Sequence, residues 1–324
     1  MKRHIALKII FIVFALLVLL LLWGLFSSYQ IMTVTEYEVS SYKVVDEMNI
    51  VLISDLHNHS FGRNNTSLVK KIQKLQPDLI LLAGDFLNFD SPDVHVPLEL
   101  ILQLVDLAPV YYSLGNQEVG YLEKPEGSTL IADLESAGAT VLDKEYIQTE
   151  VNGTDIVIGG IYEYAFGYDG IGHMDKSEMP EDTLGFLESF QEEPSFKIMM
   201  AHRPDSFLFG DAEETWDIDL VLSGHLHGGQ VIIPFKGGLY GGDFGWFPEY
   251  DYGEYHFDAV KTMIITRGLG SGRQKLPRFN NIPEIVLIRL RGEIKSSKKN
   301  QDLWEEIISG EYPDYYKRYM KINE

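Results

Sequence analysis

The 324-residue chain contains no cysteine. A disulfide framework, a zinc–thiolate site and a thiol nucleophile are therefore excluded. The absence of thiols fits an exported domain. Many cytosolic proteins also lack cysteine, so composition alone leaves the compartment open.

Basic residues are scarce, with 27 lysines and arginines against 48 aspartates and glutamates, for a formal net charge of −21. Polyanions need clustered positive side chains, so no nucleic-acid partner is expected. A phosphate substrate stays open, because bound divalent cations reverse the local sign of an acidic pocket. Apolar residues make up 45% of the chain, which is enough for a packed core.

One long stretch, residues 9–26, has neither a charge nor a proline. As a helix it spans about 27 Å, close to the hydrocarbon thickness of a bilayer. Lys2, Arg3 and Lys8 precede it, so the positive-inside rule places residues 1–8 in the cytoplasm and the rest of the chain outside. We predict an uncleaved signal anchor at 9–26, embedded in the lipid bilayer of the cell membrane as a single pass. A cleaved signal peptide is the alternative.

Beyond the anchor, the pattern predicts a tether at 27–47 and a folded domain at 48–294. Short apolar runs predict strands, and helical periodicity appears between them. Such unbroken apolar strands, separated by helices, are typical of a parallel sheet covered on both faces. Strands are predicted at 49–54, 78–82, 110–114, 139–143, 145–151, 155–161, 196–202 and 219–225, and late antiparallel strands at 254–258, 261–266 and 284–291. Helices are predicted at 65–76, 96–107 and 183–190, and a C-terminal helical tail at 295–324.

Polar residues cluster at the ends of five of these strands. Because the carboxyl ends of parallel strands share one edge of a sheet, we expect these side chains to meet there. They are Asp55, His57, Asp85, Asn116, His202, His225 and His227. Carboxylates and imidazoles suit divalent Mn, Fe, Zn or Co, and the set is too large for one ion and right for two. Asp85, which lies centrally, is the predicted bridging ligand.

Each of these residues taken alone has an ordinary structural explanation, such as a turn or a helix cap. Those explanations do not account for five clusters at five strand ends. In order, the motifs are D-L-H at 55–57, G-D at 84–85, G-N-x-E at 115–118, His202 and G-H-L-H at 224–227. This ordered set resembles the calcineurin-like metallophosphoesterases over roughly residues 49–290. The stretches GHLHGGQVIIP and TRGLGSGR are similar to a membrane-anchored bacterial branch, which resembles UDP-2,3-diacylglucosamine pyrophosphatase-like phosphodiesterases.

The resemblance implies a four-layer α/β/β/α sandwich in place of one parallel sheet. It implies one metal ion on Asp55, His57, Asp85 and His227, and a second on Asp85, Asn116, His202 and His225. It also implies that a metal-bridging hydroxide hydrolyses a phosphodiester or phosphoanhydride, with no phospho-enzyme. The expected substrate is a phosphorylated small molecule or a lipid-linked phosphate.

The sequence departs from the family motif at Gln117, where a histidine usually serves as the proton donor. A glutamine amide forms hydrogen bonds but cannot act as a general acid. Three readings stay open. The leaving group has a low pKa, or another acid such as His59 or Glu118 substitutes, or the protein is a catalytically degenerate metal-dependent binding protein at the cell surface. We predict Asp85, Asn116, Gln117 and His59 as the catalytic residues.

Two further features have two readings each. Arg203 directly follows a predicted ligand, and it either contacts the substrate phosphate together with Asn116 or pairs with a surface acid. The glycine- and aromatic-rich loop 235–252 either contacts an apolar or lipid-like substrate, or packs Trp246 and Phe247 into a small core.

Overall fold

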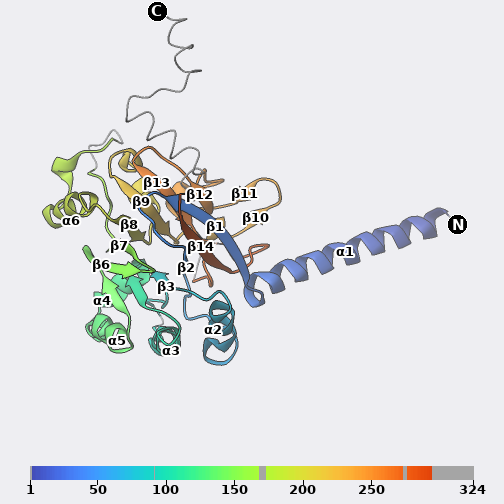
Figure 1. Ribbon diagram of the computed structural model, residues 1–324. Helices are drawn as coiled ribbons and strands as arrows, with labels where there is room; N and C mark the ends of the chain where they lie inside the picture. Colours follow the sequence, from blue (N-terminus) through green and yellow to red (C-terminus); the bar gives the residue numbers. More distant parts are fainter. Residues whose placement is uncertain (1, 91, 168–172, 273–275, 294–324) are drawn as a thin grey trace, which may run out of the picture.

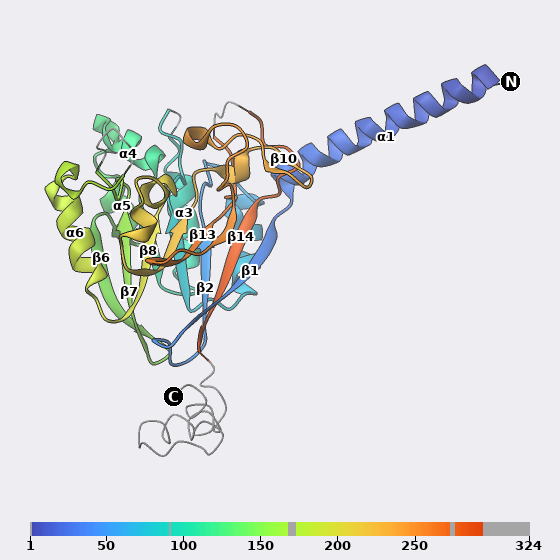
Figure 2. The ribbon, with the colours of Figure 1, turned by 90° about the horizontal axis from the view of Figure 1, so that it is seen from above.

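Two six-stranded sheets pack face to face, with helices on the outer face of each (Figures 1 and 2). The computed structural model describes residues 2–90, 92–167, 173–272 and 276–293. Three helices cover the first sheet, namely α2 (Thr66–Gln73), α3 (His95–Leu104) and α5 (Leu130–Ser136), and α6 (Glu181–Gln191) covers the second. The α/β/β/α sandwich that the family resemblance implies is thereby confirmed.

The first sheet has the order β1-β14-β2-β3-β4-β5. Strands β2 to β5 run parallel, and β14 is antiparallel to β2 but parallel to β1. The strands are β1 (Thr33–Ser41), β2 (Met48–Ile53), β3 (Leu79–Ala83), β4 (Val110–Ser113), β5 (Thr140–Leu142) and β14 (Glu284–Gly292). The helices are α2 (Thr66–Gln73), α3 (His95–Leu104), α4 (Asn116–Leu122) and α5 (Leu130–Ser136).

The second sheet has the order β12-β13-β9-β8-β7-β6, with β7, β8, β9 and β13 parallel to one another. Its strands are β6 (Glu145–Val151), β7 (Thr154–Ile161), β8 (Phe196–Ala201), β9 (Ile218–Ser223), β12 (Gly253–Tyr255) and β13 (Val260–Ile265). Helices α6 (Glu181–Gln191) and α7 (Asp205–Leu208) belong to this half, and a small hairpin pairs β10 (Ile232–Ile233) with β11 (Gly237–Gly238).

Alternation along each central strand divides the core into layers. On β2, Ile50 and Leu52 point into the layer between the sheets, while Val51 and Ile53 point toward the helices. Both faces of the strand are buried, so its sequence from Ile50 to Ile53 is one unbroken run of apolar residues. The single parallel sheet predicted from this pattern is wrong. An apolar strand face does not reveal whether a helix or a second sheet covers it.

The segment predicted as a tether is largely structured, and that prediction is wrong. Helix α1 (Lys2–Gln30) continues four residues past the apolar stretch, and β1 follows and pairs with β14 along its nine residues. The polar and apolar alternation of β1 marks an edge strand with one wetted face, although it resembles a linker in composition. The tail predicted at 295–324 lies outside the described residues.

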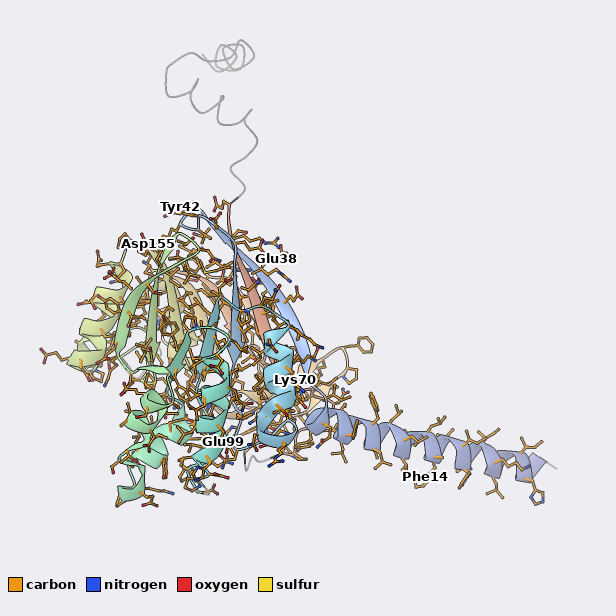
Figure 3. All side chains as sticks on the ribbon, turned by 60° about the horizontal axis from the view of Figure 1, so that its bottom comes forward. Phe14, Glu38, Tyr42, Lys70, Glu99 and Asp155 are labelled. Atoms are coloured by element: carbon orange, nitrogen blue, oxygen red, sulfur yellow. The ribbon has the colours of Figure 1, made fainter. Side chains whose placement is uncertain are left out.

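Helix α1 projects away from the rest of the molecule (Figures 1 and 2). Phe14 on this helix stands clear of the domain, as do most of its neighbours (Figure 3). The segment His4–Gln30 is the one helix in the described part of the chain that is long and apolar enough to cross a membrane. A bare apolar helix of this length is consistent with the predicted anchor.

Candidate metal centre

All seven predicted ligands follow the carboxyl ends of parallel strands, at one end of the sandwich. Asp55 and His57 follow β2, Asp85 follows β3, and Asn116 opens α4 after β4. From the second sheet, His202 follows β8, while His225 and His227 follow β9. Six of the seven form two groups with the spacing of metal ligands: Asp55, His57 and His227 in one, and Asp85, His202 and His225 in the other.

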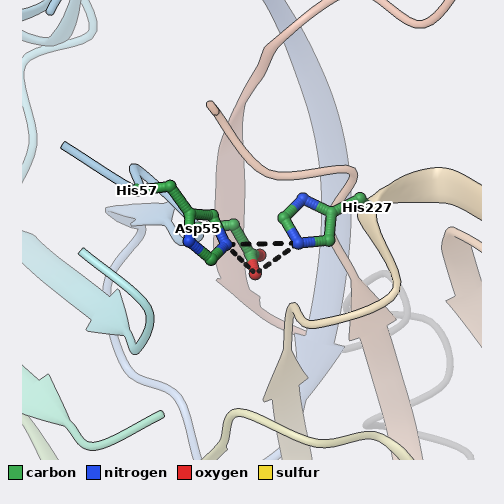
Figure 4. A group of neighbouring side chains, drawn as sticks. All are labelled: Asp55, His57 and His227. Atoms are coloured by element: carbon green, nitrogen blue, oxygen red, sulfur yellow. Dashed lines mark hydrogen bonds and ion pairs between the residues drawn. The ribbon is translucent and has the colours of Figure 1, made fainter. Parts of the chain in front are cut away.

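The three residues of the first group are buried, and their side chains converge (Figure 4). The Nε2 atoms of His57 and His227 lie 3.3 Å apart, and their rings stack. Asp55 Oδ1 lies 3.9 Å from the first nitrogen and 3.6 Å from the second. Two imidazole nitrogens and one carboxylate oxygen therefore face a common point, which is the donor set that borderline divalent ions prefer.

Asp85 connects the two groups. Its Oδ2 lies 3.3 Å from His202 Nε2 in the second group and 3.6 Å from His57 Nε2 in the first. Its Oδ1 accepts a hydrogen bond of 2.8 Å from the Gln117 backbone N–H. One oxygen is thus fixed by the backbone, and the other faces both sets of ligands. This arrangement suits a carboxylate shared between two ions.

Three of the four predicted ligand histidines, His57, His202 and His227, are oriented by a contact of the ring nitrogen Nδ1, which leaves Nε2 facing the ligand group. Nδ1 of His57 lies 2.9 Å from the Asn88 side-chain oxygen. Nδ1 of His202 lies 2.7 Å from the Ala83 carbonyl, and that of His227 lies 3.2 Å from the Gly270 carbonyl. These oxygens can only accept, so the Nδ1 atoms carry the hydrogens, and in the neutral ring each Nε2 presents a lone pair to an ion.

Asn116 supplies a direct test of whether the residues fit a metal. Its Oδ1 is buried and finds no hydrogen-bond partner in the described part of the chain. A buried polar atom without a partner costs about 1–3 kcal/mol, and an ion at the second group would satisfy it. The donor set and this orphaned oxygen both fit the two divalent ions implied by the sequence.

The buried charges explain how a protein without ions would tolerate this cluster. Burial opposes a charge on His202, but the adjacent Asp85 carboxylate outweighs burial and raises the pKa of His202 to about 10. Burial and the charge on His202 lower the pKa of His225 to about 3. Burial also raises the pKa of Asp55. Metal binding must therefore displace a proton from the cluster, and apparent affinity should weaken on acidification.

Backbone strain is concentrated at the ligands. Asp55, His57, Asp85, His225 and His227 all have positive φ angles, between 48° and 69°. Non-glycine residues rarely adopt this left-handed conformation, and each instance costs of the order of 1 kcal/mol or more. Five such residues at five ligand positions indicate that the fold holds these side chains in place at a cost in stability, as functional sites do.

Two glycines let the backbone approach the ligands closely. A Cβ atom on Gly115 would lie 2.3 Å from Asp85 Oδ1, and one on Gly224 would lie 2.4 Å from Asp55 Oδ2. Any side chain at either position would push a ligand carboxylate out of place. The glycines of the G-N-x-E and G-H-L-H motifs are thus required by contact rather than by turn geometry.

Glu118 has a different role from the proton donor considered in the sequence. Its buried carboxylate accepts hydrogen bonds from the backbone N–H groups of Asp85, Phe86 and Gly115 and from the Tyr112 hydroxyl, at 2.8–2.9 Å. It therefore fixes the loop that carries the bridging carboxylate. Carboxylates that accept several backbone bonds are strong local organisers, but nothing in the sequence distinguishes one from an acid aimed at substrate.

Glu118→Gln is expected to weaken metal binding about 10–100-fold without removing a ligand, because one oxygen acceptor becomes a donor facing N–H groups. Calorimetric titration of the metal-stripped protein measures this change. Glu123→Gln, at an exposed position on the same segment, is the matched control and should bind as the wild type does. Equal affinity of the Glu118 variant and this control would contradict the assigned role.

The remaining predicted site residues are engaged elsewhere. The Gln117 side-chain oxygen accepts the Phe89 backbone N–H at 3.0 Å. His59 Nε2 lies 3.1 Å from the Tyr29 carbonyl at the end of α1, outside both ligand groups. Burial lowers the pKa of His59. These contacts give His59 a place against the anchor helix, so its predicted catalytic role has no support from its position.

Arg203 pairs with acids, the second of its two predicted alternatives. Its guanidinium lies 2.7 Å from Asp205 and 2.7 Å from Asp243, and it stacks over the Tyr164 ring. Arg203, the residue after the predicted ligand His202, lines a cavity of about 580 Å³. The other lining residues are Tyr162, Glu163, Tyr164, Phe166, Glu178, Pro180 and Phe209. A cavity with four aromatic rings in its lining, reached by the residue that follows His202, can take the part of a substrate beyond its phosphate.

Comparison with known proteins agrees with the fold. The family model for calcineurin-like phosphoesterases matches residues 48–229, more than half of the chain. The chain therefore belongs to the calcineurin-like phosphoesterase family and is a hydrolase of the metallophosphoesterase type.

Three relatives show the range of similarity. A putative metallophosphoesterase of Caenorhabditis elegans, F40B5.2, is 32% identical over 194 residues, which cover 58% of this chain but 38% of that protein. The uncharacterized metallophosphoesterase YkuE of Bacillus subtilis is 26% identical, over 79% of this chain and 85% of its own. Phosphodiesterase YaeI of Escherichia coli is 27% identical, over 74% of this chain and 81% of its own.

Proposed function

We propose that this protein is a single-pass membrane enzyme that uses two divalent metal ions to hydrolyse a phosphodiester or phosphoanhydride outside the cytoplasm. The observation that carries the proposal is the Asp85 carboxylate, one oxygen of which faces both ligand groups within 3.6 Å. A single structural metal would need neither the second group nor a shared ligand. The similarity to a protein named as a phosphodiesterase supports the choice of substrate class.

The residues divide into three tasks. Asp55, His57, His227 and Asp85 would hold one ion, and Asp85, Asn116, His202 and His225 the other. When bound, the ions would supply a water of lowered pKa and positive charge against the phosphate oxygens. The Asn116 amide can donate to a phosphate oxygen while its own oxygen serves as a ligand. The aromatic cavity beside Arg203 would seat the substrate group beyond the phosphate.

The lack of an evident proton donor for the leaving group restricts the class of substrate that the enzyme can hydrolyse. Gln117 has no proton to give, Glu118 is occupied by four donors, and His59 lies against α1. The reaction therefore favours a leaving group that departs without a proton, such as a phosphate in an anhydride or a weakly basic alcohol or phenol. General acid help is worth about 10²–10⁴ in rate, so its loss is tolerable for such substrates.

A series of aryl phosphodiesters tests this function with the full chain in detergent, stripped by chelator and reloaded with Mn²⁺. We expect metal-dependent hydrolysis of bis-p-nitrophenyl phosphate, and a steep fall in rate as the leaving phenol becomes more basic. Gln117→His should restore a donor and speed the poor leaving groups by up to about 10²-fold, while the good ones change little.

Two outcomes would count against the proposal. Absence of turnover by a protein shown to hold metal would leave a metal-dependent binding protein. A rate insensitive to the leaving group would mean that an acid other than Gln117, Glu118 and His59 donates the proton.

The membrane position rests on α1. The charge pattern places residues 1–8 in the cytoplasm and the metal centre on the other side. Protease added to intact cells should digest the domain but spare the residues before the anchor. Protection of the domain until the cells are opened would reverse the assigned orientation.

A further inference from the structure

We propose that the β10–β11 hairpin is a second membrane contact, which places Phe235 in the interface of the bilayer that holds α1 and sets the metal centre at the level of the lipid headgroups. The inference rests on the proposed anchoring of α1 and goes beyond it. It assigns a binding surface, with a lipid bilayer as its partner, to a segment outside the ligand groups.

The hairpin tip presents large apolar side chains to solvent. Phe235, in the turn between β10 and β11, is fully exposed. In the adjacent loop, Trp246 is 56% exposed and Phe247 is 45% exposed, so neither ring lies in the small core that one of the two readings of this loop gave them. Lys236 lies over the Phe247 ring, 3.6 Å from its centre. Exposed aromatic rings with a flanking cation are the composition of a membrane interface.

A short segment fixes the hairpin against the helix. The Phe279 ring lies against Gly24 of α1, where a Cβ atom would come within 2.7 Å of it, and the Asn280 N–H lies 3.3 Å from the Gly24 carbonyl. On its other side, this segment bonds Ile232 of β10, through the Phe279 carbonyl at 3.1 Å and the Asn280 side chain at 2.8 Å. The hairpin is thus held at the height of Gly24.

Gly24 lies two residues before the end of the apolar stretch 9–26. In a spanning helix this position is about 3 Å below the point where the chain leaves the hydrocarbon. The hairpin base therefore lies at the bilayer surface, and Figure 2 shows the hairpin at the domain end of α1. A tip at this height reaches the interface that aromatic side chains favour.

Hydrogen bonds also connect the metal centre to the end of α1 that lies at the bilayer surface. The Asn281 backbone N–H donates a hydrogen bond to the Ser28 hydroxyl of α1 at 3.1 Å. The Asn281 side chain donates to the carbonyl of the ligand His227 at 2.6 Å and to that of Gln230 at 3.1 Å. Ser28 is about one helical turn beyond Gly24. A ligand loop hydrogen-bonded through one residue to this turn lies within reach of phosphates at the membrane surface.

The absence of cysteine makes a clean test possible. The full chain carrying Phe235→Cys is labelled with an environment-sensitive fluorophore and placed in phosphatidylcholine vesicles, some of which contain spin-labelled lipid as a quencher. We expect blue-shifted emission and loss of most of the intensity when the quencher lipid is present. Tyr42→Cys is the control, because Tyr42 is 79% exposed and lies at the opposite end of the domain from α1 (Figure 3).

The inference is overturned if the label at position 235 responds like the label at position 42 in protein that floats with the vesicles. The inference is also overturned if the protein does not float with the vesicles, because α1 then does not anchor it in the bilayer. Both labelled positions are surface side chains, so folding is preserved, and thermal melting confirms it. The readout needs no turnover, so failure of the hydrolysis proposal is seen separately, in the diester assay.

Discussion

Asp85→Asn is expected to reduce metal-dependent phosphodiester hydrolysis by about 10²–10³-fold or more and to leave the protein unable to retain both ions. The Asp85 carboxylate is the ligand that faces both groups. An amide there keeps the acceptor for the Gln117 N–H but loses the negative charge. Asparagine also tolerates the left-handed backbone at this position, where φ is 60°. The variant therefore separates charge from backbone geometry.

Two measurements keep this result interpretable. Unfolding of the metal-free variant should occur more easily than that of the wild type, because loss of the Asp85 carboxylate leaves the buried His202 without its charge partner, so activity is measured well below the variant's melting temperature. Asp106→Asn, at an exposed carboxylate, should retain full activity and two ions. If Asp85→Asn kept wild-type turnover with both ions bound, the bridging assignment would be wrong.

A chain that starts at Tyr42 is expected not to fold, whereas one that starts at Ser27 should fold and bind metal. The shorter chain loses β1, which pairs with β14 along nine residues, and exposes β14 as a bare edge. It also loses the hydroxyls of Ser28 and Tyr29, which accept the backbone N–H groups of Asn281 and Arg278. With each hydrogen bond worth about 1 kcal/mol, the loss approaches the 5–15 kcal/mol that stabilises an ordinary domain.

The two truncations form a matched pair, since both lack the membrane-spanning stretch. Circular dichroism, solubility and metal binding distinguish them. Equal solubility and equal metal affinity would show that residues 27–41 are a dispensable tether after all. Aggregation of both chains would mean that the spanning part of α1 itself supports the domain.

That the predicted ligand side chains would meet was predictable because it depends on a single geometric rule. Parallel strands place their carboxyl ends together, so Asp55, Asp85 and His202 could be brought into one site without any knowledge of contacts. The ordered motifs then assigned the ligands to two ions. The structure places six of the seven side chains in two groups, and in the described part of the chain the buried Asn116 side-chain oxygen has no hydrogen-bond partner.

Other features could not be predicted because several structures share the same local pattern. An unbroken apolar strand such as β2 is compatible with a covering helix or a covering sheet, so the number of sheets stayed hidden. Edge strand β1 has the polarity of a linker. The sequence also does not show whether Glu118 points toward substrate or backbone, because both roles need a carboxylate at the start of a helix. Only contacts between distant segments decide these cases.

The central claim is that this chain works through two ions sharing Asp85, and one titration tests it most directly. The chelator-stripped full chain is titrated with Mn²⁺ while bound metal and bis-p-nitrophenyl phosphate hydrolysis are measured on the same samples. We predict two ions per chain at saturation and activity that stays low until the second ion binds. Full activity at one ion per chain, or saturation at a single ion, would contradict the account.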